Sequence, residues 1–330
     1  MNFPKNLVKR RFFEVKSVSK QRKNKVVNQI AQITKASNQG ASATRRAHSE
    51  RMNDMINELH NEGFKVGDLR GLSDKHVHAL VTLWKEKGIS GQVQANRMST
   101  IRKYTYAVAN HAISTSNDKY NLTPKQKNLN DSVRIELAQK ITVLDIARIR
   151  PEHKEIQLSY ELALRFGLRK EESILFEPKK CIIRDKYSNE IKSIYLKYGI
   201  TKGNRPREIQ IRTDKQRDLI ERIDKHCKDN GLKKLIPLNK TAKQQYTKAE
   251  YERKLANLPN FHSMRHQYAR DRFHELTGHE VPILDPTYRA KNMTERERQE
   301  YDIACDIISH DTGHSREDVV RNYIGNIHKP

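Results

Sequence analysis

Cysteine is scarce in this chain of 330 residues, and the three that occur, Cys181, Cys227 and Cys305, lie far apart. With no CxxC pair, the sequence predicts neither a disulfide framework nor a zinc site, and it fits a reducing compartment. It also lacks any run of 18 apolar residues, so no transmembrane helix is expected. The basic N-terminal stretch has no continuous apolar segment, which excludes a secretory signal. We therefore expect a globular, cytoplasmic protein without a membrane partner.

Acidic residues are too few to balance the basic ones. The chain has 40 Asp and Glu against 64 Lys and Arg, which leaves a net charge of +24. Such an excess opposes compaction through self-repulsion, and a polyanionic partner would relieve it. Nucleic acid is the strongest candidate, because Lys and Arg that neutralise phosphates release counterions. A ribosomal or merely basic protein is the alternative, so charge predicts the partner and leaves the reaction open.

The first third of the chain divides into two parts. Residues 1–40 carry a basic run, which predicts either an N-terminal arm that becomes ordered on DNA or a solvated tail. Residues 41–122 contain three stretches with helical spacing, whose inner stripes run over Met52–Leu59, Val77–Trp84 and Val93–Val108. A small helical bundle with basic faces is suited to clamping DNA, and equally to binding another protein.

The remainder, residues 123–330, begins with a polar linker and then becomes mixed. A helix over Glu152–Phe166 is expected to stop at Gly167, and helices resume at Asp214. Between them lie three short β-like runs, Cys181–Ile183, Ile191–Leu196 and Glu208–Ile211. The expected fold is mainly α with one small antiparallel sheet, arranged as a helical domain followed by an α+β domain.

Six side chains in four short segments are candidates for chemistry: Arg169, Lys202, His262, Arg265, His314 and Tyr323. Taken alone, each segment has an ordinary structural explanation, since a Gly-Leu-Arg at a helix end or a Lys-Gly turn is common. A tyrosine near a C-terminus is usually a core residue. His262 and His266 have the spacing of a metal pair, but the glutamate of an HExxH motif is missing and no cysteine or carboxylate cluster completes a site. We therefore expect no bound metal.

Taken together, the order and spacing of these segments resemble the tyrosine recombinase family, also called the phage integrase family. The resemblance covers roughly residues 150–325 and rests on Gly-Leu-Arg-x-x-Glu at 167–172, His-x-x-Arg at 262–265 and Gly-His-x8-Tyr at 313–323. It implies a site-specific recombinase, the integrase of a mobile element, with residues 41–122 as its core-binding domain and 123–330 as its catalytic domain. It also implies a homotetramer on double-stranded DNA at the nucleoid.

Cleavage of a phosphodiester requires charge stabilisation and a proton for the leaving oxygen. Two guanidiniums that bind phosphate oxygens in a fork suit the non-bridging oxygens, and we assign this role to Arg169 and Arg265. Lys202 resembles the general acid of the family, which protonates the 5′-oxygen, and Glu172 orients Arg169. Because cations replace a metal, and no GxxxxGK[ST] loop occurs, neither a cofactor nor ATP is expected.

A tyrosine nucleophile needs assistance, because a phenol is largely protonated at neutral pH. By the resemblance, Tyr323 attacks to give a 3′-phosphotyrosyl intermediate. His262 deprotonates or positions it, and His314 holds a phosphate oxygen. Tyr268 and Tyr301 are the rival nucleophiles, but only Tyr323 has the family's distance from a Gly-His pair.

Two departures from the family pattern stand out. The stretch between Arg265 and His314 is longer than usual, which indicates an inserted loop and helix. Such an insertion could contact DNA or a neighbouring protomer, or it could be a passive surface addition. Thr312 stands where the family usually has leucine before the glycine, and His310 would replace His314 if the alignment slipped.

Two alternatives remain at this point. One is a relative with the same chemistry, such as a type IB topoisomerase or a telomere resolvase. The other is a non-catalytic DNA-binding protein of this fold. The completeness of the six-residue set favours an enzyme, whereas the DNA site, the direction of the reaction and any accessory proteins cannot be inferred from the sequence.

Overall fold

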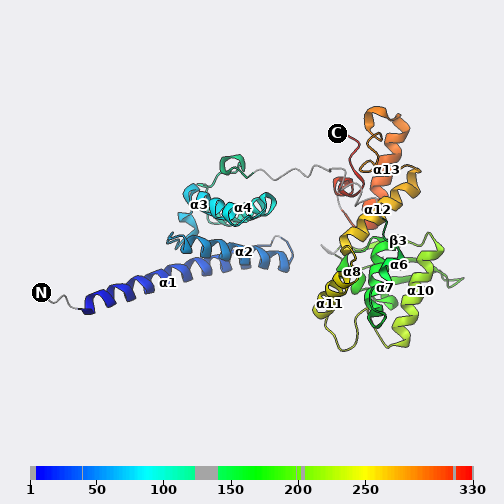
Figure 1. Ribbon diagram of the computed structural model, residues 1–330, viewed down its shortest axis with the longest axis horizontal. Coiled ribbons are helices and arrows are strands. Elements are labelled where there is room, and N and C mark those ends of the chain that lie inside the picture. Colours follow the sequence, from blue (N-terminus) through cyan, green and yellow to red (C-terminus); the bar gives the residue numbers. More distant parts are fainter. Residues whose placement is uncertain are drawn as a thin grey trace. The chain divides into compact units, whose positions relative to one another are not determined.

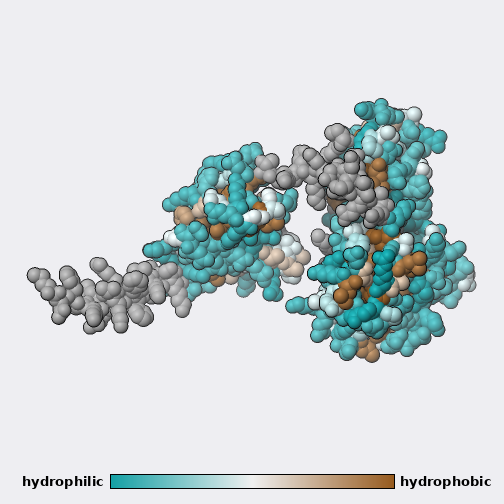
Figure 2. All heavy atoms as spheres, in the orientation of Figure 1, coloured by the Kyte–Doolittle hydropathy of each residue, from teal (hydrophilic) through white to brown (hydrophobic). Residues whose placement is uncertain are grey.

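The computed structural model describes residues 5–38, 40–122, 140–197, 199–201, 205–314 and 317–328, with side chains from residue 21 onward except that of Glu317. The chain forms two compact units, Met1–Asn128 and Leu129–Pro330 (Figure 1). Among the helices within these ranges, none combines the length and the apolar character needed to span a bilayer. The face of each unit seen in Figure 2 is largely hydrophilic, with apolar residues confined to small areas.

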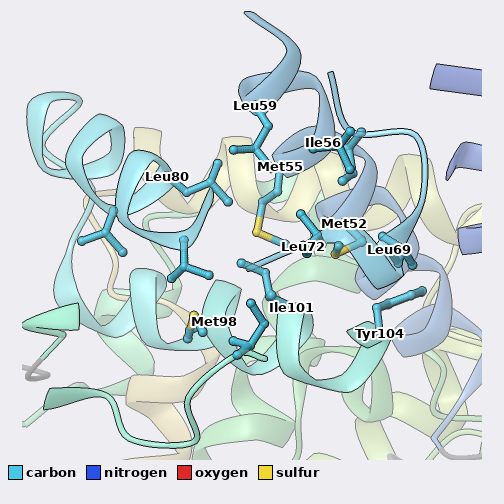
Figure 3. Packing of buried hydrophobic residues seen from close by; sticks show 14 of the residues in the cluster. Met52, Met55, Ile56, Leu59, Leu69, Leu72, Leu80, Met98, Ile101 and Tyr104 are labelled. Carbon is cyan, nitrogen blue, oxygen red and sulfur yellow. The ribbon is translucent and has the colours of Figure 1, made fainter. Parts of the chain in front are cut away.

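The first unit is helical. Its elements are α1 (Lys5–Ala36), α2 (Ser42–Asn61), α3 (Asp74–Glu86) and α4 (Gly91–Tyr106), with 3-10 turns η1 (Leu69–Gly71) and η2 (Asp118–Tyr120). Side chains from α2, α3 and α4 point toward one another in its core, among them Met55, Leu80 and Ile101 (Figure 3). The second half of α1 adds Val26 and Ile30, both fully buried. Residues from the predicted basic arm therefore contribute to this core.

The three helical stretches expected between residues 41 and 122 are confirmed as α2, α3 and α4, but one inner position is wrong. Val93 was placed on the buried stripe of α4 and is 44% exposed. In this first turn Gln94 faces inward instead, because its amide nitrogen donates to the carbonyl oxygen of Ile89 at 2.6 Å. Further along, Ile101 and Tyr104 are buried as expected.

The second unit combines helices with one small sheet. Its helices are α6 (Val143–Ile146), α7 (Lys154–Phe166), α8 (Lys170–Ile174), α9 (Pro178–Cys181), α10 (Asp214–Asp229), α11 (Ala242–Leu255), α12 (Phe261–Thr277), α13 (Glu295–Thr312) and α14 (Arg321–Ile324). Its strands are β1 (Ile182–Arg184), β2 (Ile191–Leu196) and β3 (Arg207–Gln210), and its 3-10 turns are η3 (Pro151–His153), η4 (Ala290–Asn292) and η5 (Glu317–Val319). The predicted fold class, mainly α with a small antiparallel sheet, is confirmed.

The sheet has the strand order β1-β2-β3 with antiparallel pairing, and Ile194 faces both Ile182 and Ile209 across it. Its apolar side chains pack with Leu162 of α7 and Leu219 of α10 in one buried cluster. The alternation of buried and exposed residues along β3 places Arg207 on the buried face of the sheet.

Helix α12 lies at the centre of the second unit. It contacts α7 on one side and α13 and α14 on another, and Figure 1 shows it between the part that holds the sheet and the part that holds α13. Asn260 caps its first turn by accepting from the backbone N–H groups of His262 and Ser263. Residues from several segments distant in sequence therefore meet along this helix.

Candidate active site

The turn between α7 and α8 sets the position of Arg169. Gly167 ends α7 with φ +62°, and a Cβ atom added there would lie 2.5 Å from Cδ1 of Tyr268, so only glycine fits. Arg169 follows as the N-cap of α8. Its backbone N–H and its Nη1 each donate to the Glu172 carboxylate at 2.8 Å, and its Nη2 donates to the Gly313 carbonyl at 3.2 Å. Glu172 therefore orients Arg169, as the sequence predicted.

The same carboxylate holds a second arginine, which the sequence analysis missed. Arg207 donates from Nη1 and Nη2 to Glu172 at 3.1 and 2.7 Å, and from Nε to the Asp311 carbonyl at 2.9 Å. Burial alone would raise the pKa of Glu172, but the hydrogen bonds and charges of Arg207 and Arg169 outweigh it and lower this pKa to about 2. In the sequence, Arg207 differs from its neighbours only by its spacing of two residues from Ile209, which places both on one face of β3 but does not reveal that the arginine is buried.

Arg265 is the most deeply buried cation of the cluster, at 1% exposed. Its guanidinium donates to the backbone carbonyls of Gly167 and Thr312. Burial, followed by the charge of Arg169, lowers its pKa to about 10, so it stays charged at neutral pH. In the part of the chain that the structure describes, Arg265 Nε finds no hydrogen-bond acceptor.

His314 joins this cluster to Tyr323. Gly313 ends α13 with φ +61°, and His314 follows it with Nε2 2.9 Å from Nη2 of Arg265 and 2.9 Å from the Tyr323 hydroxyl. A guanidinium can only donate, so Nε2 is an acceptor, and the tyrosine hydroxyl donates to it as well. Burial and the nearby charges of Arg265, Arg169 and Arg207 lower the pKa of His314 to about 3, which keeps the imidazole neutral.

Aromatic contacts surround the Tyr323 ring. His262, exposed in the first turn of α12, has its ring centroid 5.6 Å from that of Tyr323. His266, one turn later, lies closer at 4.4 Å, and the guanidinium carbon of Arg265 is 6.0 Å from the ring centre. His266 is thus a second residue whose place beside Tyr323 the sequence analysis missed, since its spacing was read only as a metal pair. Lys202, the remaining predicted residue, lies outside the described residues.

Two family models match the chain. The model described as "Phage integrase, N-terminal" matches residues 23–113, and the model described as "Integrase" matches residues 130–271. The chain belongs to the phage integrase, or tyrosine recombinase, family. The second match includes the positions of Arg169, Lys202, His262 and Arg265 and ends before the last two predicted site residues.

Solved structures of tyrosine recombinases share the fold of this phage integrase family member. The lambda integrase dimer (residues 75–356) bound to a COC′ core site has 17% sequence identity and a TM-score of 0.55, over 90% of this chain and 94% of that one. The Tn1549 transposon integrase in complex with circular intermediate DNA has 15% identity and a TM-score of 0.52, over 92% and 95%. No curated protein sequence matches the chain.

The rival tyrosines of this integrase-family chain have other partners. The hydroxyl of Tyr268 donates to the carboxylate of Asp311 at 2.7 Å, and that of Tyr301 donates to the carbonyl of Gly325 at 2.8 Å. Burial raises the pKa of both phenols. Neither hydroxyl is therefore suited to attack a phosphate in this arrangement.

The fallback histidine is also far less suited to the site. His310 has a side chain that is 64% exposed, and its Nδ1 lies 3.9 Å from the Asp311 carboxylate. His314, by contrast, contacts both Arg265 and Tyr323. Within the described ranges, no three His, Cys, Asp or Glu side chains are grouped so that they could hold a metal ion.

Proposed function

We propose that this chain is a site-specific DNA recombinase that cuts and rejoins strands through Tyr323, as the integrase of a mobile element. The contact that carries the proposal is the hydrogen bond between Tyr323 and His314, inside a cluster that includes Arg169 and Arg265. A phenol held against guanidiniums is what attack on a phosphodiester requires. The similar lambda integrase is bound to a core site and the similar Tn1549 integrase to circular intermediate DNA, which supports double-stranded DNA as the substrate.

The arginine cluster is suited to hold the scissile phosphate. Arg169 is 22% exposed and keeps part of its guanidinium accessible, while Arg265 Nε is a buried donor without an acceptor among the described residues. A phosphate that accepts from both would have its non-bridging oxygens neutralised before the tyrosine attacks. Removing one such donor typically costs about 10²–10³ in rate.

The proton of the tyrosine passes to a histidine. In the free protein the neutral His314 accepts the hydrogen bond from Tyr323, and three neighbouring guanidiniums oppose its protonation. A bound phosphate offsets that repulsion, so the imidazole becomes more basic when DNA arrives. The family resemblance assigns these roles differently, with His262 as the residue that deprotonates or positions Tyr323 and His314 as a ligand of a phosphate oxygen, so His262 is the alternative base. The tyrosine oxygen then bonds to phosphorus, the bond to the 5′-oxygen breaks, and Lys202 protonates the departing oxygen.

Rejoining is the reverse reaction, in which a 5′-hydroxyl attacks the phosphotyrosyl bond and releases Tyr323. The intermediate keeps the energy of the cleaved bond, so neither ATP nor a metal is consumed. Exchange between two duplexes requires four strand cleavages, one for each tyrosine, and we therefore propose a homotetramer on DNA. Residues 41–122 would act as the DNA clamp, which the N-terminal family match over residues 23–113 supports. Residues 1–40 would add a further DNA contact, in agreement with the net charge of +24.

The decisive experiment traps the covalent intermediate. A binding site is first selected by the protein from a library of random duplexes, and a nick beside the expected cleavage position then lets the cleaved end diffuse away. Wild type should form an adduct that survives denaturation, without ATP and in the presence of a chelator. Tyr323→Phe should bind the DNA and form none. Tyr187→Phe is the control, because Tyr187 is 98% exposed and lies outside the cluster.

Each other result selects a different function. Tight binding without any adduct would favour the non-catalytic DNA-binding protein. An adduct that persists in Tyr323→Phe would assign the nucleophile to another tyrosine. Relaxation of supercoiled DNA without exchange of partners would favour the topoisomerase-like alternative.

A further inference from the structure

The segment between α12 and α13 lies against the residues that follow Tyr323. The N–H of Ile283 donates to the carbonyl of Ile324 at 2.9 Å, and the N–H of Ala290 donates to that of Ile327 at 3.1 Å. Between these two contacts, Tyr301 of α13 donates its hydroxyl to the Gly325 carbonyl at 2.8 Å. Three of the four carbonyls that directly follow the proposed nucleophile therefore accept hydrogen bonds from residues between Ile283 and Tyr301.

The backbone at Gly325 also packs closely against the segment between α12 and α13. Gly325 has φ +98°, and a Cβ atom added to it would lie 2.5 Å from the nitrogen of Ile283 and 2.9 Å from the carbonyl carbon of Pro282. No side chain fits at that position without moving one backbone away from the other. The buried side chains around it form a single apolar cluster with α14, whose members include Val281, Tyr288, Met293, Tyr301, Cys305, Val320, Tyr323, Ile324 and Ile327.

Hydrogen bonds also fix the conformation of the segment between α12 and α13. Arg289 donates from Nη1 to the carbonyls of Pro282, Asp285 and Tyr288 at 2.9–3.0 Å. Arg298 of α13 donates to the carbonyl of Ala290. These interactions connect the loop to itself and to α13, so it can transmit a restraint to α14 and is more than a passive surface loop.

We propose that residues 281–293, the clasp, hold the helix that carries Tyr323 in the catalytic site of its own chain, and that Tyr301 is a positioning residue. The inference rests on the proposed role of Tyr323 as nucleophile. The clasp keeps the tyrosine hydroxyl beside His314 before DNA binds, so cleavage does not wait for a neighbouring protomer to seat the segment. A misplacement of about 1 Å at a reacting group can cost about 10² in rate, and this is the loss that the clasp prevents.

A matched pair of tyrosines tests the positioning role. Tyr301 and Tyr288 are buried in the same apolar cluster, but only the Tyr301 hydroxyl contacts Gly325, and that of Tyr288 has no hydrogen-bond partner among the described residues. With the nicked duplex, Tyr301→Phe should slow single-turnover adduct formation at saturating DNA by roughly 5-fold or more. The DNA concentration for half-saturation should stay unchanged. Tyr288→Phe should alter neither quantity, and equal rates for the two variants would overturn the proposal.

A second experiment requires neither DNA nor activity. Gly325→Ala forces the clasp and the segment after Tyr323 apart, whereas Gly278→Ala adds a Cβ at a comparable positive φ of +73° with nothing within 4 Å. In hydrogen exchange on the full chain, amides of 281–293 and of 321–327 should lose protection together in Gly325→Ala and keep it in Gly278→Ala. Loss in only one of the two segments, or in neither, would overturn the clasp.

A third experiment varies the protein concentration. On duplexes that carry a single half-site, in excess over protein, the wild-type rate of adduct formation per molecule should be independent of protein concentration. A rate that rises with concentration would mean that a neighbour seats the tyrosine, and the clasp proposal would fail. If wild type never forms an adduct, the proposed function fails, and hydrogen exchange still decides whether the clasp exists.

Discussion

A single carboxylate organises the cationic cluster. Glu172 is fully buried and accepts from the guanidiniums of Arg169 and Arg207, so one negative charge holds two positive ones in fixed places. A buried ion pair with complete hydrogen bonding is costly to break, because the partner that remains is left buried and uncompensated. Glu172 therefore links the stability of the fold to the geometry of the site.

Replacement of this carboxylate should affect stability and pH dependence together. We expect Glu172→Gln to lower the free energy of unfolding by about 3–5 kcal/mol, measured by denaturant titration at neutral pH. Because the folded pKa is about 2 and lies below the usual value, the wild type should keep this contribution above pH 5 and lose it as the pH falls toward 2. Glu172→Gln should not show this part of the decrease in unfolding free energy at low pH. Glu171→Gln, an exposed neighbour on α8, is the control and should be nearly neutral.

At the scale of elements, glycines at helix ends bring the segments of the candidate site together. Gly167 ends α7 beside Tyr268, and Gly313 ends α13 beside Arg207, each with a positive φ and no room for a side chain. In both cases the helix stops where the next residues enter the cationic cluster. The close approach of each backbone to its neighbouring side chain therefore depends on the glycine at the helix end. The helix itself determines only the direction in which the chain reaches the cluster.

A pair of glycine variants separates backbone strain from this close approach. Gly313 and Gly231 have φ values of +61° and +64°, but an added Cβ would lie 2.7 Å from Arg207 Nη1 at Gly313 and would meet nothing within 4 Å at Gly231. Gly231→Ala should cost about 1 kcal/mol of unfolding free energy. Gly313→Ala should cost at least about 1 kcal/mol more and should also slow adduct formation, since it displaces Arg207. Equal losses in thermal or denaturant unfolding would show that strain alone matters.

The sequence predicted the elements well, because their signals are local. Apolar spacing was enough for α7 and α10, with Gly167 marking the end of α7, and the three strands followed from short apolar runs between turns. Arg207 could not be recognised, since its burial depends on Glu172 and Asp311 from segments far away in the sequence. The clasp was recognised only as an insertion, because backbone contacts with Ile324 leave no trace in composition. The roles of the six predicted site residues stay predictions.

At the scale of the whole molecule, the net charge of +24 should dominate binding to DNA. Each phosphate contact releases counterions, so affinity for an unselected duplex should fall by about 10³ or more between 50 and 200 mM salt if six or more phosphates are contacted. Fluorescence anisotropy at several salt concentrations measures the slope. Tyr323→Phe removes no charge and should keep the same slope, whereas a shallow slope for both proteins would contradict a DNA clamp.

The surroundings of Arg265 have a consequence for how a phosphate is received. Its guanidinium donates to Gly167 and Thr312, the residues where α7 and α13 end, so two helix C-termini converge on one buried cation. The negative ends of helix dipoles stabilise a cation without carrying a full charge. A carboxylate in their place would compete with an incoming phosphate for the same guanidinium. The hydrogen bonds that Arg265 makes among the described residues go to these two carbonyls and to the neutral His314 and not to a carboxylate, so in the proposed reaction no anion would have to leave its guanidinium before the phosphate binds.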